Sequence, residues 1–243
     1  MTDMFHLGTG LDPSQFKPVF QEKGRVEIRN FLNPDDSGRL RQFLLNSENW
    51  RLVINAGDSV YEFPRTAVQQ FTKKQQHELE ERIARSARHG FQYRYESIRA
   101  IDGDVRLSPG SSLLDQFVRF MSSEQVLSLL AEIMGATNLA FADGQATAYS
   151  SGHFLTQHDD DVEGKHRTSA YVLGLNPVWR PEWGGLLMFH RPDGNIDEAY
   201  VPTIGTLRLF SVPAAHSVSY VTPFATEPRL SVTGWLRTRA AAP

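Results

Sequence analysis

The chain has 243 residues, of which 40% are hydrophobic, and 25 Lys and Arg residues nearly balance 28 Asp and Glu residues to give a net charge of -3. This size and composition predict one globular domain with a sizeable core, and the near-neutral charge gives no sign of direct nucleic-acid binding or of a membrane-binding surface. Because the chain has no cysteine, disulfides, thiolate zinc sites and thiol catalysis are excluded, which leaves histidines and carboxylates as the available metal ligands.

The N-terminal sequence gives no sign of export. Its first ten residues lack a basic region followed by an apolar stretch, and no apolar run in the chain approaches the roughly 18 residues that a membrane span needs. We therefore expect a cytoplasmic protein, and the sequence does not indicate its oligomeric state.

The first half of the chain predicts mixed helices and strands. Asn33 as N-cap and Pro34 at the first helical position begin one helix. The segment 73–90 has apolar residues at four-residue spacing and is expected to form a surface helix that ends at Gly90. Aromatic and polar residues then alternate over residues 91–97, which predicts a half-buried strand.

Two further helices are expected before residue 137. The first covers residues 112–121, and the second has a capping-box pattern at Ser122 and Gln125 and is expected to end at Gly135. Because no linker or repeat separates them from the second half of the chain, these helices are expected to brace the rest of the fold.

From about residue 138 the pattern changes to short β-rich runs separated by turn residues. Eight runs begin at residues 145, 153, 167, 184, 199, 205, 216 and 229. This density favours a jelly roll or barrel over a parallel sheet with crossover helices. We expect an α+β, mainly β fold: a double-stranded β-helix in one domain over residues 1–243, with a support region (1–137) and a jelly-roll core (138–243). A domain boundary near residue 137 is the alternative.

The stretch 157–161, QHDDD, places three adjacent carboxylates beside a histidine. Side chains on a strand alternate between its faces, so His158 and Asp160 are expected to point the same way. A divalent cation between them would offset the repulsion that makes buried carboxylates costly. Such a pair in isolation more often occurs by chance, so the prediction depends on further ligands.

The best candidate for a third ligand is His216, at the start of a later predicted strand. Two histidines and one carboxylate leave three positions of an octahedral ion open, which is the arrangement of non-haem Fe(II) sites that bind a co-substrate and O₂ together. His190, at the end of another predicted strand, is the rival ligand. His153 and His166 are expected to lie at the surface or on the substrate side.

The last predicted strand carries a second signal. Arg229, Ser231, Thr233 and Trp235 share one of its faces, because they are two residues apart. An arginine on an inward face is costly unless it meets an anion, and the planar guanidinium suits a carboxylate. Beside a predicted iron site, this face is expected to bind the far end of a dicarboxylate.

With these motifs, the chain resembles the 2-oxoglutarate- and Fe(II)-dependent oxygenases, within them the prolyl hydroxylase branch, and most of all the ribosomal-protein prolyl hydroxylases. The similar stretches are YSSGHFLTQHDDD (149–161), WRPEWGGLLMF (179–189), GTLRLF (205–210), the histidine at 216 and RLSVTGW (229–235), with HGFQYRYES (89–97) upstream.

The resemblance implies His158, Asp160 and His216 as iron ligands and Arg229 as the partner of the 2-oxoglutarate C5 carboxylate. It also implies Ser231 or Thr233 as support for that carboxylate and Tyr149 as a co-substrate contact. The implied cofactors are Fe(II), 2-oxoglutarate and O₂, with ascorbate as an optional addition.

One position departs from the pattern of this family. Gly174 stands where many prolyl hydroxylases offer a second tyrosine to 2-oxoglutarate, and Tyr171 is expected to face the other side of its strand.

The activity implied by the resemblance is hydroxylation of a prolyl residue in a protein or peptide, which includes a ribosomal protein, with conversion of 2-oxoglutarate to succinate and CO₂. A hydroxylase of a free amino acid or another small metabolite is the alternative within the same class. A jelly-roll binding module without catalysis is the alternative outside it. Substrate-binding residues are not identified by the sequence. Trp179 and Trp183 are expected either to wall the entrance or to pack on the sheet, and Gly184 and Gly185 to allow a bulge or a close backbone approach.

Overall fold

Six α-helices form in residues 5–239, the part of the chain that the computed structural model describes. They are α1 (Pro13–Lys23), α2 (Pro34–Leu45), α3 (Arg65–Gln69), α4 (Lys73–Ala87), α5 (Leu113–Met121) and α6 (Glu124–Met134), and a 3₁₀ turn, η1, spans Pro181–Trp183. None of the helices in this part of the chain is both long and apolar enough to cross a bilayer.

The helix ends follow the local sequence with two exceptions. One is α4, which ends at Ala87, three residues before the predicted stop at Gly90. The side chain of Asn33 accepts a hydrogen bond from the Asp35 amide at the start of α2, and Gly135 ends α6 in the left-handed conformation, as predicted. The capping box predicted at Ser122 is wrong: α6 begins one residue later, without a side-chain cap. The Ser122 hydroxyl instead bonds the main chain of Val118 and of Ala142 in β5, so a tertiary contact replaces the local cap.

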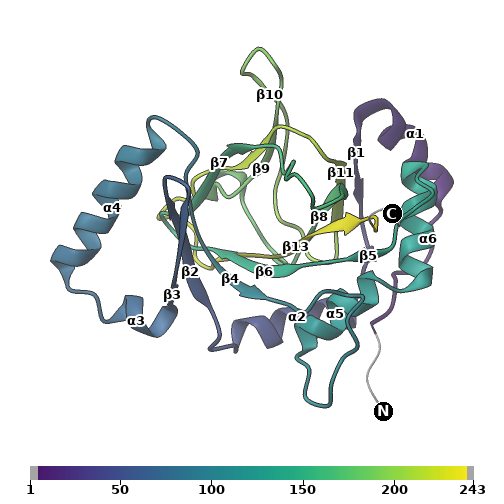
Figure 1. Ribbon diagram of the computed structural model, residues 1–243, viewed down its shortest axis with the longest axis horizontal. Coiled ribbons are helices and arrows are strands. Elements are labelled where there is room, and N and C mark those ends of the chain that lie inside the picture. Colours follow the sequence, from purple (N-terminus) through teal and green to yellow (C-terminus); the bar gives the residue numbers. More distant parts are fainter. Residues whose placement is uncertain (1–4, 240–243) are drawn as a thin grey trace.

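Thirteen strands form a single curled sheet (Figure 1). They are β1 (Arg25–Ile28), β2 (Arg51–Ala56), β3 (Ser59–Pro64), β4 (Tyr93–Arg99), β5 (Phe141–Ala142), β6 (Gln145–Tyr149), β7 (Phe154–His158), β8 (Arg167–Gly174), β9 (Leu187–His190), β10 (Ile196–Tyr200), β11 (Leu207–Ser211), β12 (His216–Val218) and β13 (Arg229–Arg237). The main path runs β1-β11-β8-β13-β6-β4-β7-β12-β9-β10, and β2, β3 and β5 attach beside it. The predicted mainly β jelly-roll fold with bracing helices is confirmed.

Strands from the first half of the chain belong to this same sheet. β1 pairs with β11, and β4 pairs with both β6 and β7. The β2–β3 hairpin extends the sheet beyond β4, next to α3 and α4 (Figure 1). The N-terminal region therefore supplies strands that flank the later ones, in addition to helices.

The two faces of β13 have different neighbours. Leu230, Val232 and Leu236 are almost fully buried and belong to the main hydrophobic core, which also includes residues of α1, α2, α5 and α6. Residues on the other face, such as Arg229 and Thr233, line a pocket inside the barrel. The period of two in this strand therefore separates the core from the candidate site.

Candidate metal centre and its pocket

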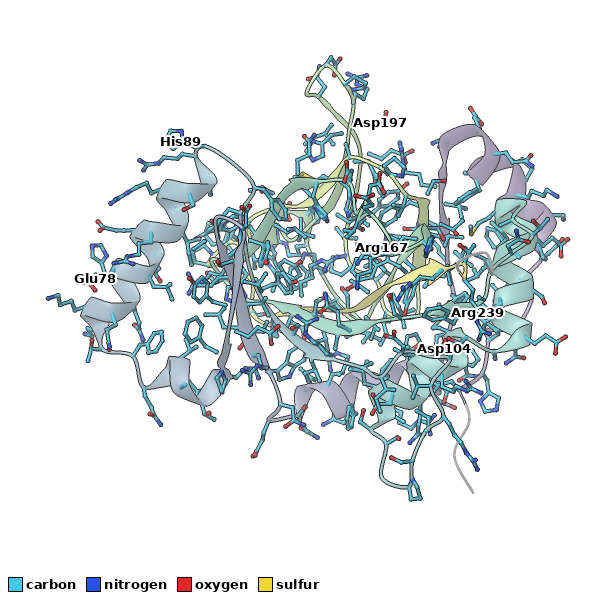
Figure 2. The ribbon with its side chains drawn as sticks, viewed as in Figure 1. Glu78, His89, Asp104, Arg167, Asp197 and Arg239 are labelled. Atoms are coloured by element: carbon cyan, nitrogen blue, oxygen red, sulfur yellow. The ribbon has the colours of Figure 1, made fainter. Side chains whose placement is uncertain are left out.

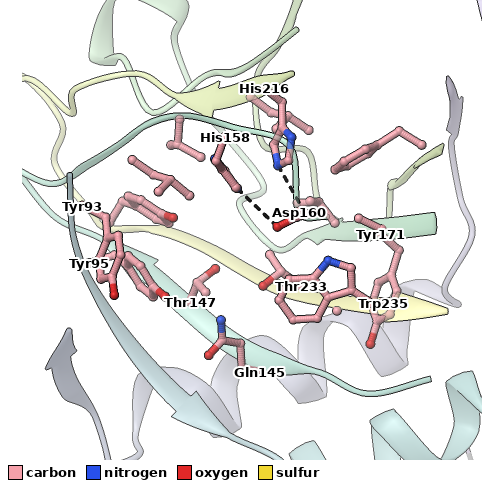
Figure 3. Close-up of a pocket in the computed structure, with 18 of the residues that line it drawn as sticks. Tyr93, Tyr95, Gln145, Thr147, His158, Asp160, Tyr171, His216, Thr233 and Trp235 are labelled. Atoms are coloured by element: carbon pink, nitrogen blue, oxygen red, sulfur yellow. Dashed lines mark ion pairs between the residues drawn. The ribbon is translucent and has the colours of Figure 1, made fainter. Parts of the chain in front are cut away.

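Two imidazoles and one carboxylate converge where β7 lies beside β12 (Figure 3). His158 is the last residue of β7, His216 is the first of β12, and the two are direct partners across the strands. His158 Nε2 lies 3.4 Å from Asp160 Oδ1, and His216 Nε2 lies 3.5 Å from Asp160 Oδ2. One ligand atom from each residue lies within 4.8 Å of the other two, close enough for all three to hold one metal ion.

Asp160 reaches this position by a different local geometry from the one predicted. The strand ends at His158, so strand alternation does not orient Asp160. Asp160 instead has a φ of 64°, a left-handed conformation that aspartate adopts more readily than most residues. Arg167 Nη1 donates a hydrogen bond of 3.0 Å to its main-chain carbonyl. A turn thus brings the carboxylate back towards the two imidazoles.

Both imidazoles are oriented by main-chain carbonyls. His158 Nδ1 lies 3.1 Å from the Thr156 oxygen, and His216 Nδ1 lies 2.7 Å from the Ala214 oxygen. Such bonds place the proton on Nδ1 and leave Nε2 as the ligand atom, which is the usual second contact of metal-binding histidines. Burial, followed by the proximity of His158, lowers the pKa of His216 to about 4, so its ring is neutral at physiological pH.

The carboxylate is held in its charged form. Burial alone would favour the neutral acid of Asp160, but hydrogen bonding to His158 and the electrostatic influence of the two histidines outweigh it and lower the pKa of Asp160. Figure 3 shows the Trp235 indole ring on the side of the pocket next to Asp160. Neutral imidazoles and an ionised carboxylate are the protonation states that metal binding requires.

The far end of the pocket contains an unpaired cation. Arg229, the first residue of β13, is 2% exposed, and its guanidinium lies 5.3 Å from the centre of the Tyr149 ring. No carboxylate in residues 5–239 forms an ion pair with it, and its Nε atom has no hydrogen-bond partner. Burial lowers the pKa of Arg229 to about 10, so it remains charged at neutral pH. A buried charge without a partner points to an anionic ligand.

Three of the four residues predicted to bind the co-substrate line this pocket, namely Arg229, Thr233 and Tyr149. Ser231 lies on the same strand, is fully buried, and has a hydroxyl without a hydrogen-bond partner, but it is not among the lining residues. Burial raises the pKa of Tyr149 far above its ordinary value, which keeps its hydroxyl protonated and able to donate.

Position 174 has no space for a side chain, which explains the glycine found there. A Cβ atom there would lie 2.5 Å from the carbonyl oxygen of Thr203 and 2.6 Å from its nitrogen, so the main chain after β10 fills the space of any side chain. Tyr171, expected to face the other side of its strand, is fully buried in the main core but also lines the pocket, and its hydroxyl donates to the Asp143 carbonyl at 2.9 Å.

The pocket has a volume of about 450 Å³ and one aromatic wall. Successive ring centroids of Phe91, Tyr93, Tyr95 and Tyr149 lie 5.4, 5.5 and 5.4 Å apart, and the Phe91 ring lies 5.8 Å from that of His158. We call these four residues the aromatic wall. It runs from the half-exposed Phe91 to the buried Tyr149, beside Arg229.

Several pocket residues were not predicted from the sequence. Thr147 is 2% exposed, lines the pocket and has a hydroxyl without a partner. Gln145 and Thr147 precede Tyr149 at two-residue spacing, so strand alternation in this segment was a signal that could have identified them. Arg167 also lines the pocket and stacks at 3.6 Å on the Trp235 ring. Figure 2 shows Arg167 near the centre of the barrel, whereas Glu78 and His89 lie at its periphery.

The other histidines lie outside the metal cluster. His190 Nε2 is 2.7 Å from the Ser217 hydroxyl and does not join the three converging residues. His166 is exposed in the loop after β7. His153, expected at the surface or on the substrate side, is instead 6% exposed and does not line the pocket, because the turn after Ser150 folds it inward.

The buried His153 predicts a pH-dependent stability. Burial lowers its pKa from 6.5 to about 4, so between these values the unfolded chain binds a proton that the folded chain does not. Stability should therefore fall as the pH drops from 6.5 towards 4, by up to about 3 kcal/mol for this residue. We expect His153→Gln to reduce the difference between urea unfolding free energies at pH 7 and pH 5 in metal-free protein. His89→Gln, at an exposed position, is the control, and equal pH dependence in wild type and His153→Gln would contradict the prediction.

The tryptophans and glycines of the β8–β9 connection close the Arg229 end. Trp179 is 9% exposed, donates to the Gly184 carbonyl at 2.8 Å, and packs with Tyr149 and Val221, so it packs on the barrel and does not form a free wall at the entrance. Gly184 has a φ of 71°, and a Cβ atom there would lie 1.9 Å from the Tyr220 oxygen. The close backbone approach predicted for the glycine pair is present.

The residues fit the cofactors that the sequence suggested. Two imidazoles and a carboxylate that converge from one side leave room for further ligands on the pocket side, a donor set that suits Fe(II). The unpaired Arg229 and the unpaired hydroxyl of Thr147 offer donors for an acidic co-substrate at the other end.

Comparison with known proteins agrees with this site. Residues 144–237 match the family model described as the 2OG-Fe(II) oxygenase superfamily. A prolyl-4-hydroxylase from Pseudomonas putida shares 20% identity with a TM-score of 0.60, over 94% of this chain and 100% of that one. A prolyl hydroxylase from Trichoplax adhaerens, in complex with a peptide fragment of the hypoxia-inducible-factor oxygen degradation domain, shares 17% identity with a TM-score of 0.61, over 93% and 89%.

A 2OG-Fe(II) oxygenase family oxidoreductase from Burkholderia pseudomallei shares 12% identity with a TM-score of 0.61, over 100% of this chain and 98% of that one. At these identities the structural matches establish the fold. The comparison with curated proteins found no match to the chain. The matched segment contains the three converging side chains and Arg229, so residues 144–237 carry a 2OG-Fe(II) oxygenase domain, and the protein is an enzyme whose cofactors are Fe(II), 2-oxoglutarate and O₂.

Proposed function

We propose that the protein hydroxylates a prolyl residue in a protein or peptide, with decarboxylation of 2-oxoglutarate to succinate and CO₂. The observation that carries this proposal is the single pocket that joins a His-Asp-His cluster, an unpaired buried arginine and an aromatic wall. Among prolyl substrates, a ribosomal protein is the one that the sequence resemblance implies.

In this proposal His158, Asp160 and His216 hold Fe(II). Two observations support this assignment. One ligand atom from each residue lies close to the other two, and the main-chain contacts of both Nδ1 atoms leave both Nε2 atoms free. The bound iron and 2-oxoglutarate supply the oxidising power from O₂, and the protein supplies position and the exclusion of side reactions. Burial keeps the His216 imidazole neutral, and hydrogen bonding keeps the Asp160 carboxylate ionised, before metal arrives.

Arg229 holds the remote carboxylate of 2-oxoglutarate, with Thr233, Tyr149 and Ser231 as supporting donors. A guanidinium fork binds a carboxylate through two parallel hydrogen bonds, which sets the direction of the co-substrate as well as its affinity. Thr147 adds a hydroxyl on the neighbouring strand, directly opposite Ser231. The co-substrate would therefore be fixed at one end by β13 and at the other by the metal cluster.

The substrate side favours an uncharged, compact side chain. Phe91, Tyr93 and Tyr95 present ring faces and edges between the pocket mouth and the metal cluster, with Val60 and Leu155 nearby. A pyrrolidine ring offers apolar C–H groups to such a wall without adding a charge to desolvate. The prolyl hydroxylases among the structural neighbours support the same substrate class.

Phe91→Ala should therefore weaken peptide binding without affecting the co-substrate. Loss of one aromatic contact of roughly 1 kcal/mol predicts about a fivefold higher KM for a proline-containing peptide. The KM for 2-oxoglutarate should stay unchanged, because Phe91 is at the opposite end of the aromatic wall from Arg229. Phe224, which is 70% exposed and outside the pocket, provides the control Phe224→Ala. A peptide KM equal to that of wild type would remove Phe91 from the substrate site.

The proposed activity can be tested in two steps. Anaerobic titration with Fe(II) and 2-oxoglutarate should produce the visible charge-transfer absorption of a chelated keto acid. Proline-containing peptides should then stimulate succinate release and gain the mass of one oxygen atom on proline. Stimulation by free amino acids or metabolites alone would favour the small-molecule alternative, and absence of the absorption band would argue against the metal and co-substrate assignments.

A further inference from the structure

Arg229 depends on its backbone for orientation. No carboxylate in the described chain pairs with it, its Nε atom has no hydrogen-bond partner, and the guanidinium lies 5.3 Å from the centre of the Tyr149 ring. A Cβ atom on Gly185 would already lie 3.1 Å from Arg229 Cδ, with Trp179 and Val221 at similar distances. The direction of the guanidinium is thus set by where β13 begins and by packing.

Main-chain pairing in the sheet does not hold the start of β13, at Arg229, on both of its edges. β6 pairs with β13 along one edge, opposite Arg229 at Tyr149. On the other edge the register with β8 starts at Ser231 and Gly174, the Leu175 amide makes one more main-chain bond to the Leu230 carbonyl at 3.0 Å, and the chain then leaves the sheet. The edge of β13 beside Arg229 would therefore lack a strand partner.

The side chain of Asn176 occupies that edge. Its Nδ2 donates to the Pro228 carbonyl at 2.9 Å, and its Oδ1 accepts from the Leu230 amide at 2.7 Å. These two groups flank Arg229 and point to the same edge of the strand, so one carboxamide continues the ladder in place of main chain. Asn176 is 1% exposed, and its own carbonyl accepts from the Ile204 amide at 2.9 Å, which anchors it in turn.

We propose that Asn176 is a positioning residue that clasps the main chain on both sides of Arg229 and so orients the guanidinium towards the co-substrate. This inference rests on the proposed role of Arg229 and adds to it the device that holds the residue in place. Removal of the Asn176 carboxamide would break both of these buried hydrogen bonds and leave the Leu230 amide and the Pro228 carbonyl unsatisfied.

The chain contains a matched control for this device. Asn55 donates through Nδ2 to the Phe91 carbonyl at 2.9 Å and accepts at Oδ1 from the Tyr93 amide at 3.0 Å. It clasps the residues on both sides of Gln92 and is 6% exposed, but it has no contact with the Arg229 end of the pocket. Asn55→Ala should therefore have a comparable structural cost without the effect on the co-substrate.

The test compares 2-oxoglutarate and metal affinity in the full chain. With Mn(II) in place of Fe(II), Asn176→Ala should raise the Kd for 2-oxoglutarate at least about tenfold, because misalignment that loses one hydrogen bond to a charged group costs roughly 1.5–3 kcal/mol. The Mn(II) affinity measured without 2-oxoglutarate should be unchanged, and Asn55→Ala should leave both constants as in wild type. At saturating 2-oxoglutarate the kcat of Asn176→Ala should recover while its KM stays high.

A double-mutant cycle separates positioning from a general loss of structure. If Asn176 acts through Arg229, Asn176→Ala should add little to the effect of Arg229→Met on 2-oxoglutarate affinity. Asn176→Ser, which leaves a small polar side chain, repeats the test if the alanine variant does not fold. A folded variant with wild-type affinity for 2-oxoglutarate would overturn the inference, whereas a wild-type protein that binds no 2-oxoglutarate would overturn the proposed function instead.

Discussion

Asp160→Gly should abolish metal binding without unfolding the protein. The carboxylate is the only anionic ligand in the cluster of His158, Asp160 and His216, so its loss should weaken Fe(II) or Mn(II) by more than the roughly 100-fold reached by mutations in the surrounding shell. Activity that depends on the metal should be lost with it. Equilibrium titration of the metal under anaerobic conditions provides the measurement.

Glycine is the informative replacement because of the backbone at this position. A non-glycine residue with a φ of 64° carries a conformational cost of roughly 1 kcal/mol, which glycine removes. The metal-free variant should therefore unfold at a free energy close to that of wild type, although two contacts to imidazole are lost. This separates a ligand role from a structural one.

Asp159 offers the matched control. It carries the same charge one residue earlier, is exposed, and accepts a hydrogen bond from the Asp161 amide. Asp159→Asn should leave metal affinity within about twofold, since an exposed charge is largely screened by water and salt. Wild-type metal affinity in Asp160→Gly, or an equal loss in Asp159→Asn, would remove Asp160 from the metal site.

Strand periodicity explains why so much of this site could be predicted. Arg229, Thr233 and Trp235 lie on one face of β13 because the strand is regular, and the alternate residues enter the helix-covered core. His158 and His216 belong to two strands that the sequence pattern had predicted. The direction of a side chain could therefore be predicted from the sequence where the residue lies in a regular strand.

Other features depend on contacts far along the chain. Asp160 lies beyond the end of β7, so its orientation comes from a turn and from Arg167. Position 174 is filled by the main chain of Thr203, and the clasp of Asn176 spans more than fifty residues to Leu230. Asparagine near the end of a strand predicts a turn from local chemistry alone, and its partners cannot be read from spacing.

The pocket has opposite charges at its two ends. The metal cluster carries a carboxylate with a lowered pKa, and the far end carries a guanidinium without a partner. Each buried charge costs free energy in the empty protein, and each would be compensated by a bound group of opposite sign. A metal ion at one end and a dicarboxylate that reaches from it to the other would satisfy both at once.

This arrangement of charges predicts opposite effects of Arg229→Met on binding and on stability. Loss of the guanidinium should raise the Kd for 2-oxoglutarate at least about 30-fold, the lower end of the roughly 2–5 kcal/mol that a buried charge pair loses with one partner. The free energy of unfolding without ligand should stay equal or increase, because methionine fills most of the same volume without a buried, unpaired charge. Calorimetric titration with 2-oxoglutarate and urea unfolding measure the two quantities.

Arg208 shows what a structural buried arginine does instead. It is 4% exposed and pairs with Glu27 at 2.8 Å, so Arg208→Met should destabilise the fold by leaving that carboxylate without one of its partners. It does not line the pocket, and the affinity for 2-oxoglutarate should stay within a few-fold of wild type. If Arg229→Met were the destabilised variant and kept its co-substrate affinity, the charge at 229 would have a structural role like that of Arg208. Weaker binding of 2-oxoglutarate together with equal or greater stability in Arg229→Met is expected only if the guanidinium at 229 is unpaired in the free protein and binds the ligand.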